Sequence, residues 1–171
     1  MTNLILLTKK VLIVFKGGEK HMMTHEQMKT IMYEEGRRQA LDLQERSSKM
    51  TGTELNAEDN IIPAFVAAKE VMNMLERNIG FVCKSSAGRV VKLLQPYDSD
   101  IYKEEPEELG AQWGFVWSDD PAKAKPFIAM ATSPYMTGNC CIENDNVYRS
   151  TIDNNTWAPS AYPQGWEKVE L

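Results

Sequence analysis

The sequence has few of the residue patterns on which catalysis and metal binding depend. Its only two histidines, His21 and His25, lie near the N-terminus, so no Ser-His or Cys-His pair can form within the aromatic-rich second half. The three cysteines include an adjacent pair and give neither an even disulfide framework nor a Cys-x-x-Cys metal spacing. We expect them as buried free thiols in a non-enzymatic protein without cofactor or metal. Adjacent Glu107 and Glu108 leave a hydrolase as the minor alternative.

Clustered positive charge and long apolar runs are also scarce. The net charge of −5 disfavours a nucleic-acid partner, because phosphate binding usually shows as clustered Lys and Arg. The apolar runs at residues 4–7 and 11–15 are interrupted by polar residues, whereas a helix needs about 20 apolar residues to cross a bilayer. We therefore expect neither a membrane span nor a secretory signal peptide.

Residues 1–21 have a separate explanation. The stretch KGGEKH, residues 16–21, precedes Met22 and Met23 and can be encoded by a purine-rich tract like a bacterial ribosome-binding site. We hypothesise that the native start is Met22 or Met23 and that residues 1–21 are a mistranslated leader. Removing four lysines and one glutamate would change the net charge from −5 to −8. The intact mass of the natively produced protein tests this, and a species that begins at Met1 would contradict it.

Residues 22–78 favour helix. Strong helix formers fill residues 24–49, and Thr24 is placed as an N-cap. The apolar stripe of this helix loses phase at residues 34–38, so the helix needs a partner surface. Residues 64–77 carry apolar side chains at helical spacing, with an extended conformation at residues 61–66 as the open alternative. We interpret residues 22–78 as a helical segment for attachment or oligomerisation.

From residue 79 onward, aromatics, prolines, glycines and short alternating runs predict small β structure, and this region contains an internal repeat. Each copy has a cysteine-containing strand, a polar turn, a second strand and a closing tryptophan. The aligned residues are Cys83 with Cys141, Val90 with Val147, and Trp113 with Trp166. We expect both cysteines and both tryptophans, together with Tyr148, to form the structural core.

The predicted fold class is therefore α+β, with an N-terminal helical segment followed by two small tandem β-rich modules. Residues 79–117 form the first module, residues 118–136 a linker loop, and residues 137–171 the second module. Phe127, Ile128, Met130 and Tyr135 are candidates to pack the linker onto the modules.

The second copy, NVYRSTIDNNTWAPSAYPQGWEKV, resembles the short carbohydrate-binding module that is appended to bacterial chitinases and repeated in phage virion proteins. The resemblance covers roughly residues 79–169, and the first copy is more degenerate. It implies that flat aromatic rings stack on a sugar while neighbouring polar groups bond its hydroxyls. The ring pair that follows the Val-Tyr strand in the chitinase modules is replaced here by Ile152-Asp153, and in the first copy by Leu94-Gln95.

The resemblance leaves a set of candidate sugar-binding residues. They are Trp157, Tyr162, Asp153, Asn154, Asn155 and Gln164 in the second copy, and Tyr97, Asp98 and Tyr102 in the first.

Helices followed by two such modules also resemble accessory proteins of phages that infect Gram-positive bacteria, such as capsid decoration, head-fibre or tail-tip components. This likeness implies a virion-surface protein made in the bacterial cytoplasm. Its implied partners are capsid or tail proteins, further copies of itself, with a trimer by analogy, and a host surface glycan. The alternative is an architectural virion protein that binds no sugar, which the missing ring pair favours.

Overall fold

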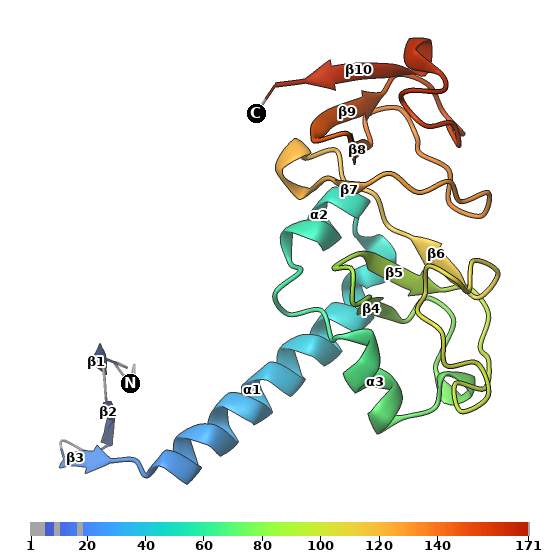
Figure 1. Ribbon diagram of the computed structural model, residues 1–171. Helices are drawn as coiled ribbons and strands as arrows, with labels where there is room; N and C mark the ends of the chain where they lie inside the picture. The colour runs from blue at the N-terminus through green and yellow to red at the C-terminus, as the bar shows by residue number, and fades with distance from the viewer. Residues whose placement is uncertain (1–5, 9–10, 17–18, 171) are drawn as a thin grey trace. The chain divides into compact units, whose positions relative to one another are not determined.

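The computed structural model describes residues 6–8, 11–16 and 19–170 (Figure 1). Contacts divide the chain into two units, Met1–Leu41 and Asp42–Leu171. The predicted α+β class is confirmed, because a long N-terminal helix is followed by two small β-sheets. No helix in the described part of the chain is both long enough and apolar enough to cross a bilayer.

The first unit contains a small sheet and most of a long helix. Strands β1 (Leu6–Thr8), β2 (Val11–Lys16) and β3 (Glu19–Met22) pair antiparallel in chain order. Residues 6–8, 11–16 and 19–21 of the hypothesised leader lie in these strands. The other residues of the leader lie outside the part of the chain that the structure describes.

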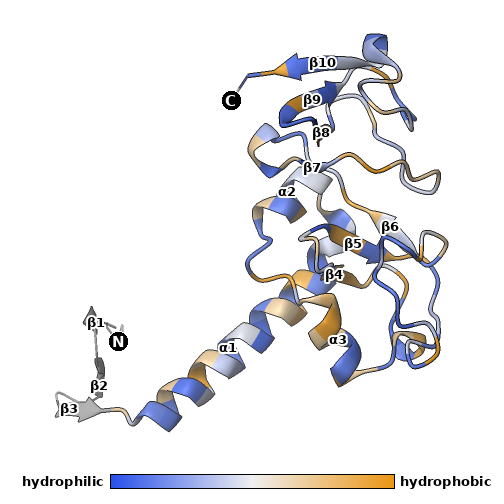
Figure 2. Ribbon diagram, in the orientation of Figure 1, coloured by the Kyte–Doolittle hydropathy of each residue, from blue (hydrophilic) through white to orange (hydrophobic). Residues whose placement is uncertain are grey.

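Helix α1 (His25–Arg46) begins in the first unit and ends in the second. The predicted N-cap is confirmed: the Thr24 hydroxyl accepts from the backbone N–H of Gln27 at 3.2 Å. The Gln27 side-chain oxygen accepts from the Thr24 N–H at 2.9 Å, which completes a reciprocal capping box. Figure 2 shows hydrophobic residues scattered among hydrophilic ones along α1. Leu43 is its only buried residue among those described.

The second unit begins with the last turn of α1 and a run of short helices. These are η1 (Ser47–Lys49), α2 (Gly52–Ala57), α3 (Phe65–Val71) and η2 (Met74–Glu76). The helical interpretation of residues 64–77 therefore holds for α3 and η2, while Ala64 pairs with Lys84 in an isolated bridge. Thr51 and Glu54 form a second capping box at the start of α2.

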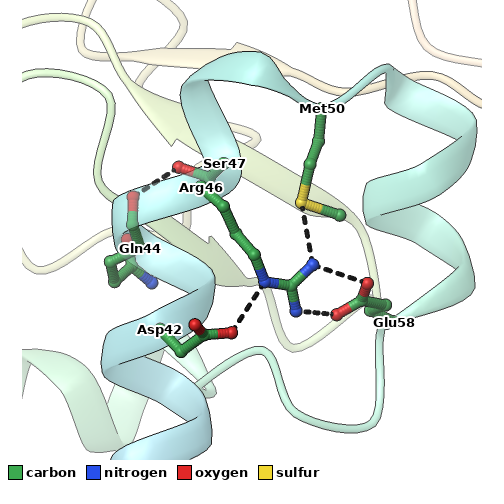
Figure 3. A network of polar contacts seen from close by, with 6 residues as sticks. All are labelled: Asp42, Gln44, Arg46, Ser47, Met50 and Glu58. Atoms are coloured by element: carbon green, nitrogen blue, oxygen red, sulfur yellow. Dashed lines mark hydrogen bonds and ion pairs between the residues drawn. The ribbon is translucent and has the colours of Figure 1, made fainter.

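Arg46 ties the end of α1 to the end of α2 (Figure 3). Its Nε donates to Asp42 Oδ2 at 2.8 Å, and its Nη1 donates to Glu58 Oε1 at 2.7 Å, with a second ion pair between Nη2 and Glu58 Oε2. Nη1 also approaches the sulfur of Met50 at 3.4 Å. The Arg46 guanidinium is the main reason why the pKa of Glu58 lies below its ordinary value. This fork-to-fork pair fixes the angle at which the chain turns from one helix to the next.

The first β module is a three-stranded antiparallel sheet covered on both faces by helices. Its strands are β4 (Val82–Lys84), β5 (Val90–Leu93) and β6 (Trp113–Phe115), in that order. Because side chains alternate along a strand, Cys83 and Val91 face α3, whereas Val82 and Val90 face the end of α1 and α2.

The second β module repeats this antiparallel order. Its strands are β8 (Cys140–Glu143), β9 (Asn146–Ser150) and β10 (Trp166–Val169). In its β8–β9 turn, Asn144 and Asp145 have φ angles of 49° and 59°, as a tight two-residue hairpin turn requires. The corresponding turn in the first module is longer and uses Gly88 at a φ of 73°.

The two modules match in register as well as in order. Cys83 pairs with Val91 as Cys141 pairs with Tyr148, and Lys84 pairs with Val90 as Ile142 pairs with Val147. The third strands agree too, since Trp113 pairs with Leu93 and Trp166 with Ser150. Trp113 and Trp166 therefore occupy equivalent positions in two equivalent small sheets.

The segment expected as a linker, residues 118–136, builds part of the second module. It contains η3 (Pro121–Lys123) and a short strand β7 (Lys125–Pro126), which pairs parallel with β8 and which sequence analysis did not predict. A column of stacked rings joins the modules through this segment: Phe115, Trp117, Tyr135 and Phe127 follow one another at centroid distances of 5.5, 4.1 and 5.5 Å. Phe127 and Tyr135 thus pack this segment onto the modules, as the sequence predicted.

Candidate functional site

Trp157 is the most exposed tryptophan side chain of the second module. It lies in the loop between β9 and β10, and 62% of its surface is exposed. Exposing a large aromatic side chain costs the free energy that burying it would gain, about 1.5–3 kcal/mol. An indole held at the surface in this way is a candidate contact for a ligand.

The backbone around Trp157 is fixed on both sides of its side chain. The Trp157 N–H donates to Asn155 Oδ1 at 3.2 Å, and the Trp157 carbonyl accepts from Trp166 Nε1 at 2.9 Å. The loop that displays the indole is therefore anchored to the buried core of the module, and the exposed ring is pre-positioned.

Asn155, a predicted sugar ligand, is instead the internal anchor of this loop. Its side chain is completely buried and donates to Ser150 Oγ and to the Gly165 carbonyl, both at 3.1 Å. Its backbone exchanges two hydrogen bonds with Tyr135, at 2.8 and 2.9 Å. Because its side chain is enclosed and its amide is engaged, Asn155 offers nothing to a surface ligand, and we remove it from the candidate site.

The other predicted residues of the second module lie in the same loop. Asp153 and Asn154 are exposed, and Asp153 Oδ1 accepts from the Thr137 N–H at 2.9 Å, which lowers the pKa of this carboxyl. Tyr162 is half-buried, with its ring against Gly165 at a distance that leaves no room for a side chain there. Gln164 is exposed. The loop thus combines one exposed ring with exposed carboxylate and amide groups.

The first module does not reproduce this arrangement. Tyr97 is 6% exposed, and its hydroxyl accepts from Trp113 Nε1 at 3.1 Å, so it is a core residue and we remove it from the candidate site as well. Asp98 accepts from Asn73 Nδ2 at 2.9 Å, which lowers the pKa of Asp98. Tyr102 is 52% exposed and meets Tyr97 edge to face, so it is the remaining exposed ring among the first-module candidates.

The two closing tryptophans have the same structural role. Both are buried, and each uses its indole N–H to hold the long loop that precedes its own strand, through Tyr97 in the first module and Trp157 in the second. Trp113 also meets Phe65 edge to face at 5.6 Å, and Trp166 meets Tyr135 edge to face at 5.3 Å. Neither indole is available to a ligand.

The remaining core candidates are also internal. Cys83 and Cys141 are free and completely buried, and burial raises the pKa of the Cys141 thiol to about 12 and that of Cys83 further. Tyr148 is half-buried and packs against the cluster around Cys141. Thiols that stay protonated at neutral pH do not suit a nucleophilic or metal-binding role. In residues 6–8, 11–16 and 19–170, no group of three acidic, histidine or cysteine side chains is placed to hold a metal.

A second surface of interest lies on α1. Its large apolar residues Ile31, Met32, Tyr33 and Leu41 are each more than half exposed. A shallow hollow on this helix is lined by Ile31 and Leu41 at its ends and by two glutamates and two arginines between them. Because most of the stability of a helix in a protein comes from the packing of its apolar side chains, an apolar contact with a partner would stabilise α1.

Comparison with known proteins gives no family assignment. No protein-family model matches the chain, and no curated protein matches it significantly.

Proposed function

We propose that this chain is a non-enzymatic accessory protein of a phage particle, and that its second module adheres weakly to host surface glycans through Trp157. The observation that carries the proposal is the indole of Trp157, which is 62% exposed on a backbone held at both its N–H and its carbonyl.

This geometry suits sugar stacking for a physical reason. A pyranose ring presents a flat apolar face that an indole covers well, and a ring fixed in advance loses little conformational freedom on binding. The exposed polar groups of Asp153, Asn154 and Gln164 come from the same loop and supply hydrogen-bonding partners for sugar hydroxyls. One ring and a few polar groups support weak binding, so useful adhesion requires several copies.

The exposed face of α1 supplies a means to bring copies together. The charged residues of this helix change sign at Gly36: Glu34 and Glu35 precede it, and Arg37 and Arg38 follow it. Glu35 and Arg38 already form an ion pair within the helix at 2.7 Å, and two copies that lie antiparallel across this point would add glutamate–arginine pairs between the copies. Self-association in turn multiplies the weak sites, and avidity gains of about 10²–10⁴ follow when several sites engage together.

A purely architectural role is the second candidate function, and two observations favour it. The tandem ring pair of the chitinase modules is replaced by Ile152-Asp153, and Tyr97 of the first module is buried. In this role Trp157 and the exposed face of α1 would contact neighbouring capsid or tail proteins.

Retention on chitin and on purified cell wall from a Gram-positive host separates the two functions. The wild type is compared with Trp157→Ala and, as the matched control, with Tyr102→Ala, which removes an exposed ring from the first module. Adhesion through Trp157 predicts that only the first substitution abolishes retention. No retention of the wild type on any glycan favours the architectural role, and equal retention of all three proteins excludes Trp157 from the site.

A further inference from the structure

Arg89 is a buried cation that the protein's own groups do not fully satisfy. It lies at the start of the first module's second strand, and its side chain is only 8% exposed. Nη2 donates to the carbonyl of Pro126 at 2.8 Å, whereas Nε lies 3.4 Å from Glu107 Oε1, too far for a good hydrogen bond. Nη1 has no hydrogen-bond partner among the described residues. Because buried polar groups in proteins are normally hydrogen-bonded, we expect a further acceptor for the Nη1 group of Arg89.

Arg89 lines a small hollow where the two modules meet. Lys123 and Lys125 of the second module line the same hollow, together with Asn56 and Ser118, and none of its lining residues is acidic. The free space accommodates a single particle of about the size of a water molecule, which rules out sulfate, phosphate and any organic ligand.

The cations that line the hollow outnumber the carboxylates paired with them. Glu107 neutralises part of Arg89 and also accepts from Ser85 Oγ at 2.6 Å. Asp59 lies 3.2 Å from Lys123. Arg89 and Lys123 thus each have a carboxylate partner, whereas Lys125 has no ion pair among the described residues. A neutral water would give Nη1 an acceptor but leave Lys125 without an opposite charge, whereas an anion would supply both.

We propose that this hollow binds one monatomic anion, chloride under physiological conditions, between Arg89 and the two lysines. Because Arg89 belongs to the first module and Lys123 and Lys125 to the second, the anion fastens the modules to each other. This site is independent of Trp157 and of any glycan. It makes the stability of the module pair depend on the halide concentration, through a ligand that binds the folded state alone.

Thermal unfolding of the full chain at constant ionic strength tests the proposal. Sodium gluconate, whose anion is too large for the hollow, is replaced stepwise by sodium chloride or sodium bromide. For a dissociation constant of about 10 mM, 100 mM halide lowers the unfolding equilibrium constant about tenfold and raises Tm by about 3–6 °C. A Tm that is the same in gluconate and in both halides overturns the proposal.

Two further measurements identify the site. Lys125→Gln removes a half-buried cation at the hollow and should abolish most of the halide-dependent shift, whereas Lys168→Gln, an exposed lysine of the second module, should leave it unchanged. Arg89→Met should abolish the halide-dependent shift in Tm if the variant folds. If it does not fold, the comparison of Lys125→Gln with Lys168→Gln still tests the proposal. Crystals grown in bromide should show an anomalous peak beside Arg89, and a peak elsewhere or none refutes the assignment.

Discussion

Replacing Asn155 with alanine should destabilise the second module, although asparagine in a polar loop would ordinarily be dispensable. The side chain is fully buried and makes three hydrogen bonds, two as donor and one as acceptor. Two of its partners keep another hydrogen bond after the change: Ser150 Oγ donates to the Ile152 carbonyl, and the Gly165 carbonyl accepts from Thr151. Only the Trp157 N–H loses the sole partner that the structure gives it.

The expected loss of stability follows from these three hydrogen bonds. Three net hydrogen bonds contribute about 1 kcal/mol each, and the cost of the unpaired N–H is limited because the Trp157 backbone lies near solvent. We expect a loss of about 3 kcal/mol in the free energy of unfolding, which corresponds to a Tm lower by about 6–12 °C for a chain of this size. The same loss of anchoring should weaken glycan retention, because the Trp157 ring is no longer fixed.

Urea unfolding monitored by tryptophan fluorescence measures the effect. The matched control is Asn154→Gly, which changes the neighbouring asparagine at an exposed position with a φ of 57°. Glycine adopts this left-handed conformation readily, so the control should stay within about 0.5 kcal/mol of the wild type. If Asn155→Ala lost less than about 1 kcal/mol, the loop would not depend on this side chain and the argument for a pre-positioned Trp157 would fail.

Three other predictions concern the helices and the thiols. Because Arg46 lowers the pKa of Glu58, this pair stabilises the fold above the ordinary glutamate pKa and loses its contribution as pH falls; acid titration of unfolding should therefore be steeper for the wild type than for Glu58→Gln. The double substitution of Ile31 and Leu41 by serine should convert self-associated protein to monomer by light scattering, and a wild type that is itself strictly monomeric would contradict self-association through α1. The three cysteines should react with a thiol reagent only on unfolding, and rapid labelling of native protein would show that they are not buried in solution.

The repeat was predictable from sequence because its signals are local. Alternating apolar residues, the Asn144-Asp145 turn and a closing tryptophan fix strands, hairpin and order, and aligning Cys83 with Cys141 gave the register that the structure has. The N-cap of α1 was predictable for the same reason, since a cap depends on residues within one turn.

Contacts between residues far apart in the sequence were not predicted, because no local sequence pattern indicates them. Strand β7 has only two residues and includes a proline, so it is defined by its neighbour β8 and not by its own sequence. Asn155 looks like any turn asparagine until Ser150 and Gly165 are brought around it. Tyr97 was likewise a candidate sugar-binding residue, but its hydroxyl accepts from the indole of Trp113 and the side chain is buried. Polar and aromatic side chains in loops are ambiguous from sequence, because tertiary contacts decide whether they face solvent or core.

The different covering of the two equivalent sheets explains why only the second module exposes an indole in the loop before its closing tryptophan. In the first module, helices cover both faces, and Phe65 of α3 and Tyr97 enclose Trp113, so the loop before β6 is drawn into the core. The short 3-10 helix η3 contacts the second sheet, but among the described residues no α-helix contributes to the clusters that cover it. Its Trp166 is covered instead by Phe127 and Tyr135 from the segment between the modules.

With its core closed by these rings, the second module does not need the indole of Trp157 for packing. In the first module the indole N–H of Trp113 donates to the hydroxyl of Tyr97, which keeps the Tyr97 side chain in the core. In the second module the indole N–H of Trp166 donates to the backbone carbonyl of Trp157, and the Trp157 ring points outward. The indole N–H of the first copy thus holds an aromatic side chain in the core, whereas that of the second copy leaves an indole exposed. A chimera that places residues 151–165 between β5 and β6 should therefore misfold, because it would remove the aromatic partner that Trp113 requires.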